Sequence, residues 1–165
     1  MLQDEILRLV AQGEGQRVEF KTGLAEQHKA LETLCAFLNS EGGHVLIGVR
    51  PNGEIAGVTV GRNTLENIAA AIARIVDPRP YPSIDAIQVG ATTVIVLSVD
   101  GRKPGQIFFA SGKAWVRVGA INTWLSAKEI TTRVLETYDQ RIARALREHD
   151  DRFLWAIRSH GIAMP

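Results

Sequence analysis

The sequence has little of what stabilises a secreted or membrane protein. Its 165 residues include one cysteine, Cys35, so an intramolecular disulfide is excluded. No apolar run approaches the roughly 20 residues that a transmembrane helix needs. The start of the chain, Met1 to Glu5, is acidic and lacks the basic segment of a signal peptide. We therefore expect a cytoplasmic protein of one domain, with no membrane segment.

Motifs for common cofactors are also missing. The sequence has no Gly-x-x-x-x-Gly-Lys-Ser/Thr loop, so a conventional phosphate-binding ATPase loop is excluded. The four histidines lie far apart, and one cysteine cannot build a structural zinc site. Cys35 lies between Leu34 and Ala36, which favours a buried, unreactive thiol over a nucleophile.

Charge is nearly balanced over the whole chain but not along it. The net charge is +1, which by itself says nothing about nucleic acid. Residues 42–120 hold eight basic residues, mostly arginine, against five acidic ones, a local balance of +3. Arginine suits phosphate because its planar fork donates two parallel hydrogen bonds, although most single surface arginines are simply solvated.

The periodicity of apolar residues predicts an α+β fold. Helical spacing occurs over 2–10, 29–38 and 64–75, and alternation or short apolar runs predict strands at 17–21, 44–49, 54–58, 84–89, 92–99, 107–110 and 114–118. We expect three hairpins, 44–58, 84–99 and 107–118, in one mixed, mostly antiparallel sheet that ends at Val118 and packs against helices.

A long C-terminal helix is expected to follow the sheet. Ser126 and Glu129 form a capping box, and apolar residues continue at helical spacing to about residue 158. Such a helix would be roughly 50 Å long, more than a compact domain of this size can cover. It either packs against a second copy of the chain or folds back onto the sheet.

The segment from Glu14 to Lys21 is the first candidate for chemistry. Glu14 lies in a glycine-rich turn, and Glu19 and Lys21 share one face of the strand that follows. Two carboxylates placed in this way can hold one divalent cation, with Lys21 near a bound phosphate. Spacing alone equally fits a surface pair of Glu19 and Lys21, worth less than about 1 kcal/mol.

Several motifs in one order give the chain a resemblance to a known family. They are Glu14-x-x-x-x-Glu19-Phe20-Lys21, the run from Leu34 to Gly43, Leu46-Ile47-Gly48-Val49, Gly53-x-Ile55-x-Gly57-Val58, and Trp115 to Gly119 with Asn122. Together they resemble the Schlafen-type Alba-like domain over about residues 5–135. We accordingly divide the chain into this domain, residues 1–135, and a C-terminal helical extension, residues 126–160.

The resemblance implies a nucleic-acid-binding domain, often found in bacterial regulators. Nuclease members of the family hold a metal with two glutamates and an aspartate, and Glu14 and Glu19 match the first two. The third position falls at residues 50–52, where this chain has no carboxylate and Arg50 would compete with a cation. The resemblance also implies a homodimer, because the nuclease relatives use two lobes and this chain supplies one.

Three hypotheses follow. The first is a non-catalytic prokaryotic regulator or defence factor that binds DNA or structured RNA, with phosphate contacts expected from Lys21, Arg50, Arg102, Lys103 and Arg117 and base stacking from Trp115 or Trp124. The second is an endoribonuclease in which Glu14 and Glu19 hold Mg²⁺ or Mn²⁺ and Lys21 neutralises the cleaved phosphate. The third is an oligomerisation or adaptor module that meets a protein partner through the C-terminal helix.

Overall fold

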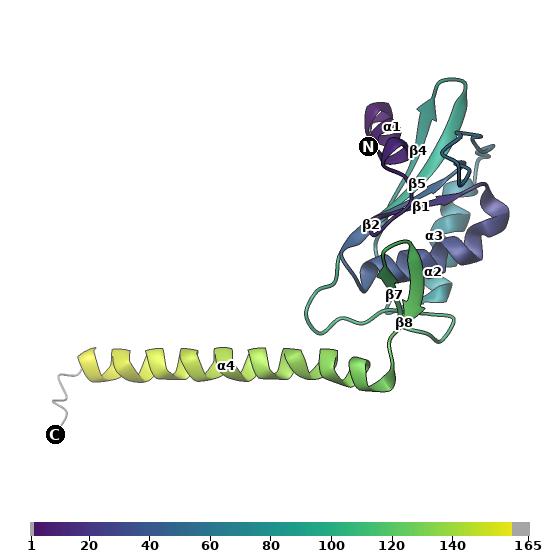
Figure 1. Ribbon diagram of the computed structural model, residues 1–165. Coiled ribbons are helices and arrows are strands. Elements are labelled where there is room, and N and C mark those ends of the chain that lie inside the picture. The colour runs from purple at the N-terminus through teal and green to yellow at the C-terminus, as the bar shows by residue number, and fades with distance from the viewer. Residues whose placement is uncertain (1, 160–165) are drawn as a thin grey trace.

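The fold is α+β, as expected, with one mixed sheet, two small two-stranded sheets and a helix that projects from the body (Figure 1). The computed structural model describes the backbone of residues 2–159 and, within it, the side chains of residues 2–136 and 142–148. Of the helices in this part of the chain, none combines the length and the apolar character required to cross a bilayer.

The main sheet has four strands in the order β1 (Val18–Lys21), β2 (Gly42–Ile47), β5 (Thr92–Asp100) and β4 (Ser83–Val89). Strands β1 and β2 are parallel, and the other two pairings are antiparallel. The centre of β5, Val94 to Leu97, is fully buried. A central strand covered on both faces explains why this run is continuously apolar rather than alternating.

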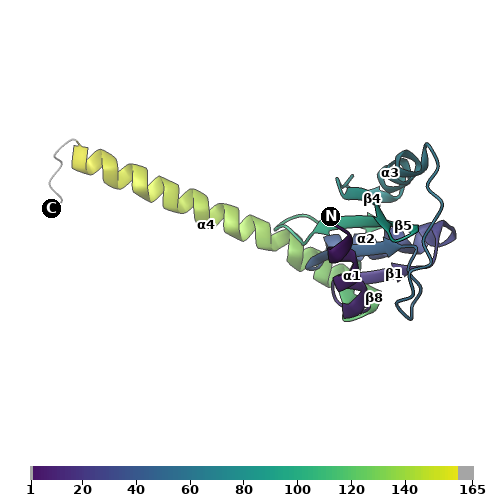
Figure 2. The same cartoon turned by 90° about the horizontal axis from the view of Figure 1, so that it is seen from above.

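Helices cover both faces of this sheet. Helices α2 (Gln27–Leu38) and α3 (Thr64–Ile75) pack on one face, where Val45 and Ile47 of β2 point. Helix α1 (Gln3–Gln12) packs on the other face through Ile6, against Phe20 and Leu46. The two hydrophobic cores therefore follow the period-two alternation of the strands, and Figure 2 shows the helices on either side.

Two small sheets complete the body beside α2. A 3₁₀ turn, Leu24–Glu26, leads from β1 into that helix. Strand β3 (Val76–Asp77) pairs with β6 (Phe109–Ala110), and β7 (Trp115–Val118) pairs with β8 (Ile121–Trp124) as a hairpin. The β7–β8 hairpin packs against α2, and that contact places its polar residues over the end of β1.

Helix α4 (Ala127–Ser159) starts where the hairpin ends and extends away from the body (Figures 1 and 2). The capping box expected at its start is present, since the Ser126 and Glu129 side chains bond one another and each other's backbone amides. Two polar contacts hold the first turns of α4 to the body. Arg102 pairs with Glu136 at 2.8 Å, and Arg133 donates to the Asn39 carbonyl.

Two of the three expected hairpins are wrong. Residues 54–58 make a single bridge, Val49 to Ile55, because β2 ends at Ile47 and Val58 bonds to Thr93 of β5 instead. Residues 107–118 also make only one bridge, Ala110 to Lys113. Their strands pair with β3 and β8, so the prediction that strand structure ends at Val118 is wrong as well.

A pair of glycine substitutions tests the close contact between β2 and β5. Gly42 and Gly13 both have φ +79°, but a Cβ on Gly42 would lie 2.6 Å from Val99 O and Gly101 N, whereas Gly13 has open space. We expect Gly13→Ala to lose about 1–2 kcal/mol of unfolding free energy from backbone strain. Gly42→Ala should lose a further 1–3 kcal/mol or so from the clash. Equal urea midpoints for the two variants would contradict the contact.

Candidate functional site

The predicted carboxylate–lysine segment forms the centre of a largely buried ionic cluster. Glu19 lies in the middle of β1, and its side chain is 12% exposed. Its Oε1 accepts a hydrogen bond from Lys21 Nζ, and its Oε2 accepts one from Arg117 Nη2 at 2.6 Å. Glu19 and Lys21 do share a strand face, as expected, but the structure adds Arg117 of β7 as a second cation. We refer to these three residues as the Glu19 cluster.

Arg117 joins four parts of the chain through this cluster. Its side chain is 1% exposed, and its Nε donates to the Gly15 carbonyl at 2.9 Å. Its Nη1 donates to Asn122 Oδ1 on β8, and Asn122 Nδ2 donates in turn to Thr33 Oγ1 on α2. One guanidinium therefore holds together the turn before β1, strand β1, the β7–β8 hairpin and helix α2.

The carboxylates do not fit the metal that the nuclease alternative needs. Both oxygens of Glu19 already accept hydrogen bonds from cations, and Glu14 Oε1 accepts the Phe20 amide at 2.9 Å. Two buried cations already face the Glu19 carboxylate, so a divalent ion would have to displace one of them. Among the described side chains, those of residues 2–136 and 142–148, no group of three or more His, Cys, Asp or Glu could hold a metal.

The five cations that we expected to contact phosphate differ in their burial and in their ion pairs. Lys21 and Arg117 are buried in the Glu19 cluster, with 9% and 4% of each residue exposed. Arg50 is exposed and pairs with Glu54 at 2.7 Å. Arg102 is bound to Glu136, whereas Lys103 is exposed on the loop after β5. The geometry thus leaves Lys21 and Arg117 no free donor directed at solvent.

The end of α2 makes a second set of buried polar contacts, which join it to neighbouring segments. Asn39 is 1% exposed; its Nδ2 donates to the carbonyls of Phe108 and Trp115, and its Oδ1 accepts the Phe108 amide. Ser40 Oγ accepts the Arg117 amide at 2.9 Å.

Burial raises the pKa of the Cys35 thiol to about 12, which fits the expected inert cysteine.

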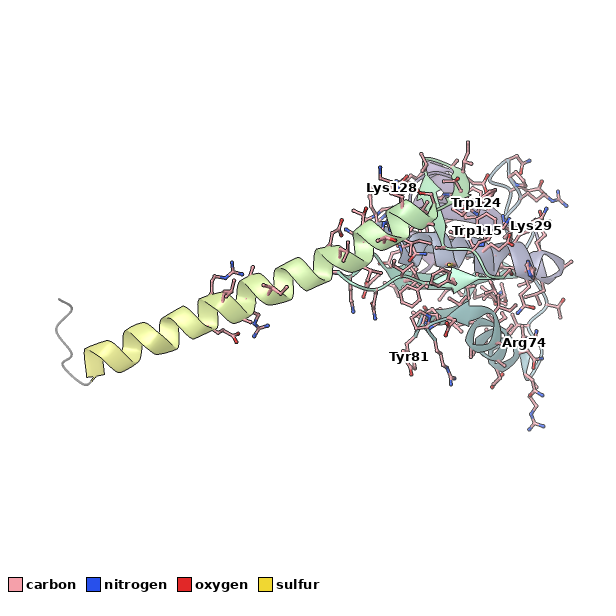
Figure 3. The ribbon with its side chains drawn as sticks, turned by 90° about the horizontal axis from the view of Figure 1, so that it is seen from below. Lys29, Arg74, Tyr81, Trp115, Trp124 and Lys128 are labelled. Atoms are coloured by element: carbon pink, nitrogen blue, oxygen red, sulfur yellow. The ribbon has the colours of Figure 1, made fainter. Side chains whose placement is uncertain are left out.

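Aromatic and basic side chains gather at the open end of the β7–β8 hairpin, on the strand face that also carries Arg117 and Asn122. Trp115 and Trp124 are cross-strand partners whose ring centroids lie 5.7 Å apart, edge to face, and Trp124 is 55% exposed. Lys113 Nζ lies 4.2 Å from the Trp124 centroid and 5.4 Å from that of Trp115. Two further exposed lysines come from the helices next to this hairpin, Lys29 from α2 and Lys128 from the first turn of α4, and Figure 3 labels both. We name these five residues the tryptophan–lysine surface.

Sequence reasoning found the tryptophans but missed the lysines. The signal was present in Lys113-Ala114-Trp115, since residues two apart share a strand face. The contribution of Lys29 could not be read locally, because α2 reaches the hairpin through tertiary contacts such as Asn122 Nδ2 to Thr33 Oγ1 at 2.7 Å. Lys128, in the first turn of α4, depends on where that helix begins.

A cleft of about 750 Å³ lies between the hairpin and α4, and Trp124 is among its lining residues. It contains three arginines, Arg102, Arg117 and Arg133, and three glutamates, Glu41, Glu129 and Glu136. Each arginine donates to a carboxylate or carbonyl of the protein itself. The cleft is therefore charge-balanced, and its cations serve the attachment of the hairpin and α4 to the body.

Arg117 and Arg50 offer a matched test, because each is bonded to one glutamate. We expect Arg117→Met to lower the unfolding free energy by about 3–5 kcal/mol, since Glu19 and the Gly15 carbonyl lose a buried partner. Arg50→Met should cost less than about 1 kcal/mol, since its pair with Glu54 is half exposed. Urea titration followed by tryptophan fluorescence measures both. A similar small loss for the two variants would show that the cluster does not hold the fold.

Comparison with known proteins agrees with this architecture. The family model described as Schlafen, AlbA_2 matches residues 14–126. No curated protein sequence matches the chain significantly. Among solved structures, the N-terminal domain of a RecG-related protein from Nitrosomonas europaea aligns with a TM-score of 0.55 and 20% identity, over 77% of this chain and 93% of that domain.

A second solved structure places the fold inside a larger protein. The DIP2311 protein from Corynebacterium diphtheriae aligns with a TM-score of 0.54 and 19% identity, over 67% of this chain and only 22% of its own length. Both identities are low, so these two likenesses establish the shared fold and nothing more. The family match, which covers most of the chain and every residue of the Glu19 cluster, shows that this protein belongs to the Schlafen, AlbA_2 family.

Proposed function

We propose that the protein binds single-stranded segments of nucleic acid through the tryptophan–lysine surface, without cleaving them. The observation that carries the proposal is the exposed Trp124 ring with the Lys113 ammonium 4.2 Å from its centre. An unpaired base can stack on such a ring, and the adjacent cation can meet the phosphate that follows it. Family membership gives independent support for a nucleic-acid partner.

The geometry favours unpaired bases over a duplex. Base stacking on an aromatic ring needs a base that is not already stacked between neighbours, and each stacked base contributes about 1–3 kcal/mol. Contacts within and beside the hairpin restrict the movement of the Trp124 ring. Trp115 packs against Trp124 edge to face, the Trp115 indole nitrogen donates to the Ala110 carbonyl, and β8 pairs with β7. A rigid ring loses little conformational entropy when a base binds.

Two further cations belong to the surface. Lys29 and Lys128 are exposed on the helices that adjoin the hairpin. Cations beside a bound strand would contact its phosphates and release counterions. Arg50, Arg102 and Lys103, expected from the sequence, keep exposed or half-exposed heads and add to the diffuse positive field, but Lys21 and Arg117 do not. The endoribonuclease alternative has no favourable observation, because the Glu19 cluster holds no free carboxylate.

The tryptophan at the centre of the surface gives the test. We expect Trp124→Ala to weaken binding of a short fluorescein-labelled single strand by roughly 5- to 150-fold, the loss of one stacked base. Trp124→Phe should keep most of the affinity, since it retains a ring. Lys113→Met should lower the slope of log affinity against log salt by about one unit. Fluorescence anisotropy at several salt concentrations, with DNA and RNA strands and a duplex, measures these changes.

Arg50→Met serves as the control, because it removes an exposed cation outside the surface. The proposal fails if the parent protein binds no strand at low ionic strength, or if Trp124→Ala binds as tightly as the parent. Cleavage of the RNA that persists in Glu19→Gln and needs a divalent ion would revive a nuclease at another place on the chain.

A second candidate function, self-association, rests on helix α4. Val134, Leu135, Ile142 and Leu146 are 41–61% exposed on a helix that extends beyond the body. We propose that a second copy of the chain covers them, which would supply the homodimer expected from the resemblance. Two paired helices of this length offer a contact long enough for stable coiled-coil packing. Such a dimer would carry two domains that bind single-stranded nucleic acid, which suits the regulatory role expected from the resemblance.

Substitutions on opposite sides of α4 distinguish this role. We expect the double change Ile142→Asp and Leu146→Asp to convert a dimer into a monomer, because two carboxylates would enter the apolar contact. Arg144→Asp adds the same charge roughly 160–200° around the helix, and it should leave the dimer intact. Light scattering coupled to size-exclusion chromatography measures the mass. A monomeric parent, or an unchanged dimer in the double variant, would exclude α4 as the interface.

A further inference from the structure

The largest unexplained feature of the body is a cleft at the open edge of the main sheet. It has a volume of about 530 Å³ and lies between the connector at residues 79–83, the end of β5 and the loop at residues 101–106. Buried side chains of Leu38 and Phe108 line its floor. Small-molecule sites commonly have this size and an apolar floor with a few polar groups at the rim.

Two exposed cations stand at the rim of this cleft. Arg79 comes from the connector and Lys103 from the loop after β5. In the described part of the chain neither makes a salt bridge, in contrast to Arg50 and Arg102, and Asp100 is the one carboxylate among the lining residues. Burial, together with nearby Arg17, lowers the pKa of His44 below its ordinary value, so its ring adds no charge at neutral pH. The lining therefore has a net charge of +1 and can accept an anion.

An exposed aromatic ring stands beside these cations. Tyr81 is 89% exposed, the highest value among the large apolar and aromatic side chains of the described residues. Its neighbours Pro80 and Pro82 restrict the backbone on either side, and Pro80 is itself buried. The ring is thus presented on a stiff, anchored segment. In Figure 3, Tyr81 lies well apart from Trp115 and Trp124.

We propose that this cleft binds a nucleoside monophosphate unit, with its phosphate between Arg79 and Lys103 and its base against Tyr81. Charge-assisted hydrogen bonds from the two cations would recognise the phosphate, and the tyrosine ring would recognise a planar base. The hydroxyls of Ser83 and Ser98 line the same cleft, where Ser83 Oγ donates to Asp85 and Ser98 Oγ bonds His44 Nδ1, and each oxygen keeps a lone pair for a sugar hydroxyl. The unit has two possible sources, a free nucleotide or the 5′-phosphorylated end of a strand.

This site is separate from the tryptophan–lysine surface, so each proposal can fail without the other. None of the five residues of that surface lines the cleft. Trp124→Ala should therefore leave binding of a free nucleotide unchanged, whereas it weakens binding of a strand. A ligand lost in Trp124→Ala but retained in Arg79→Ala belongs to the tryptophan–lysine surface alone.

The test uses the full chain and isothermal titration calorimetry with adenosine monophosphate, adenosine and inorganic phosphate as probes. We expect the monophosphate to bind at least about tenfold more tightly than either part alone, since it engages both halves of the cleft. Arg79→Ala and Lys103→Ala should each weaken it by about tenfold. Tyr81→Phe should retain binding and Tyr81→Ala should not. Arg74→Ala removes an exposed arginine on α3 that does not line the cleft, and it is the matched control.

A short strand with and without a 5′-phosphate identifies the source of the ligand. If Arg79→Ala weakens the free nucleotide, the cleft takes a nucleotide from solution. If it weakens only the phosphorylated strand, the cleft takes a strand end, and the proposal also stands. The proposal is overturned if neither probe responds to Arg79→Ala and Lys103→Ala, or if Arg74→Ala has the same effect. Thermal melting of each variant, which should match the parent because the changed residues are exposed, excludes misfolding as the cause.

Discussion

The buried ion pair between Glu19 and Arg117 is the interaction on which the arrangement of this protein depends. Removing two charges from water is costly, and the cost is recovered only where every remaining donor and acceptor is satisfied. Arg117 meets that condition through Gly15, Asn122 and Glu19, and Lys21 completes the carboxylate. Strand β1 is an edge strand of the main sheet, and its one neighbour there is the parallel strand β2. The Glu19–Arg117 pair attaches the β7–β8 hairpin to β1 and so determines the position of the hairpin.

The same pair bears on the metal site that the sequence suggested. Both oxygens of Glu19 accept hydrogen bonds from cations, so a metal would have to displace Lys21 or Arg117 from this carboxylate. The ion pair holds the β7–β8 hairpin, which carries Trp115 and Trp124 on the same strand face as Arg117 and Asn122. The rings that we propose for recognition therefore share a hairpin face with the residues that position the hairpin.

Most residues that carry the family resemblance belong to this internal framework. Asn39 and Ser40 bond β6 and β7, and Gly42 lets β2 approach β5 so closely that a Cβ would overlap its backbone. Two cavities flank the framework and differ in one respect. The arginines in the cleft beside α4 are paired within the protein, whereas Arg79 and Lys103 at the sheet edge are not. This difference in pairing, rather than the number of cations, is the basis on which we propose an anion site at the second cleft.

The sequence by itself determined the helices, the 84–99 hairpin, the α+β class and the burial of Cys35, because each depends on periodicity or flanking residues within a short window. It also identified Glu19 and Lys21 as neighbours, since residues two apart share a strand face. Only the tertiary structure decided that residues 54–58 leave the hairpin, that β7 pairs with β8, and that Arg117 lies on Glu19, 98 positions earlier in the chain. Pairing between distant segments depends on which polar groups are left to satisfy once the core has closed. That requirement belongs to the whole fold, and no local pattern contains it.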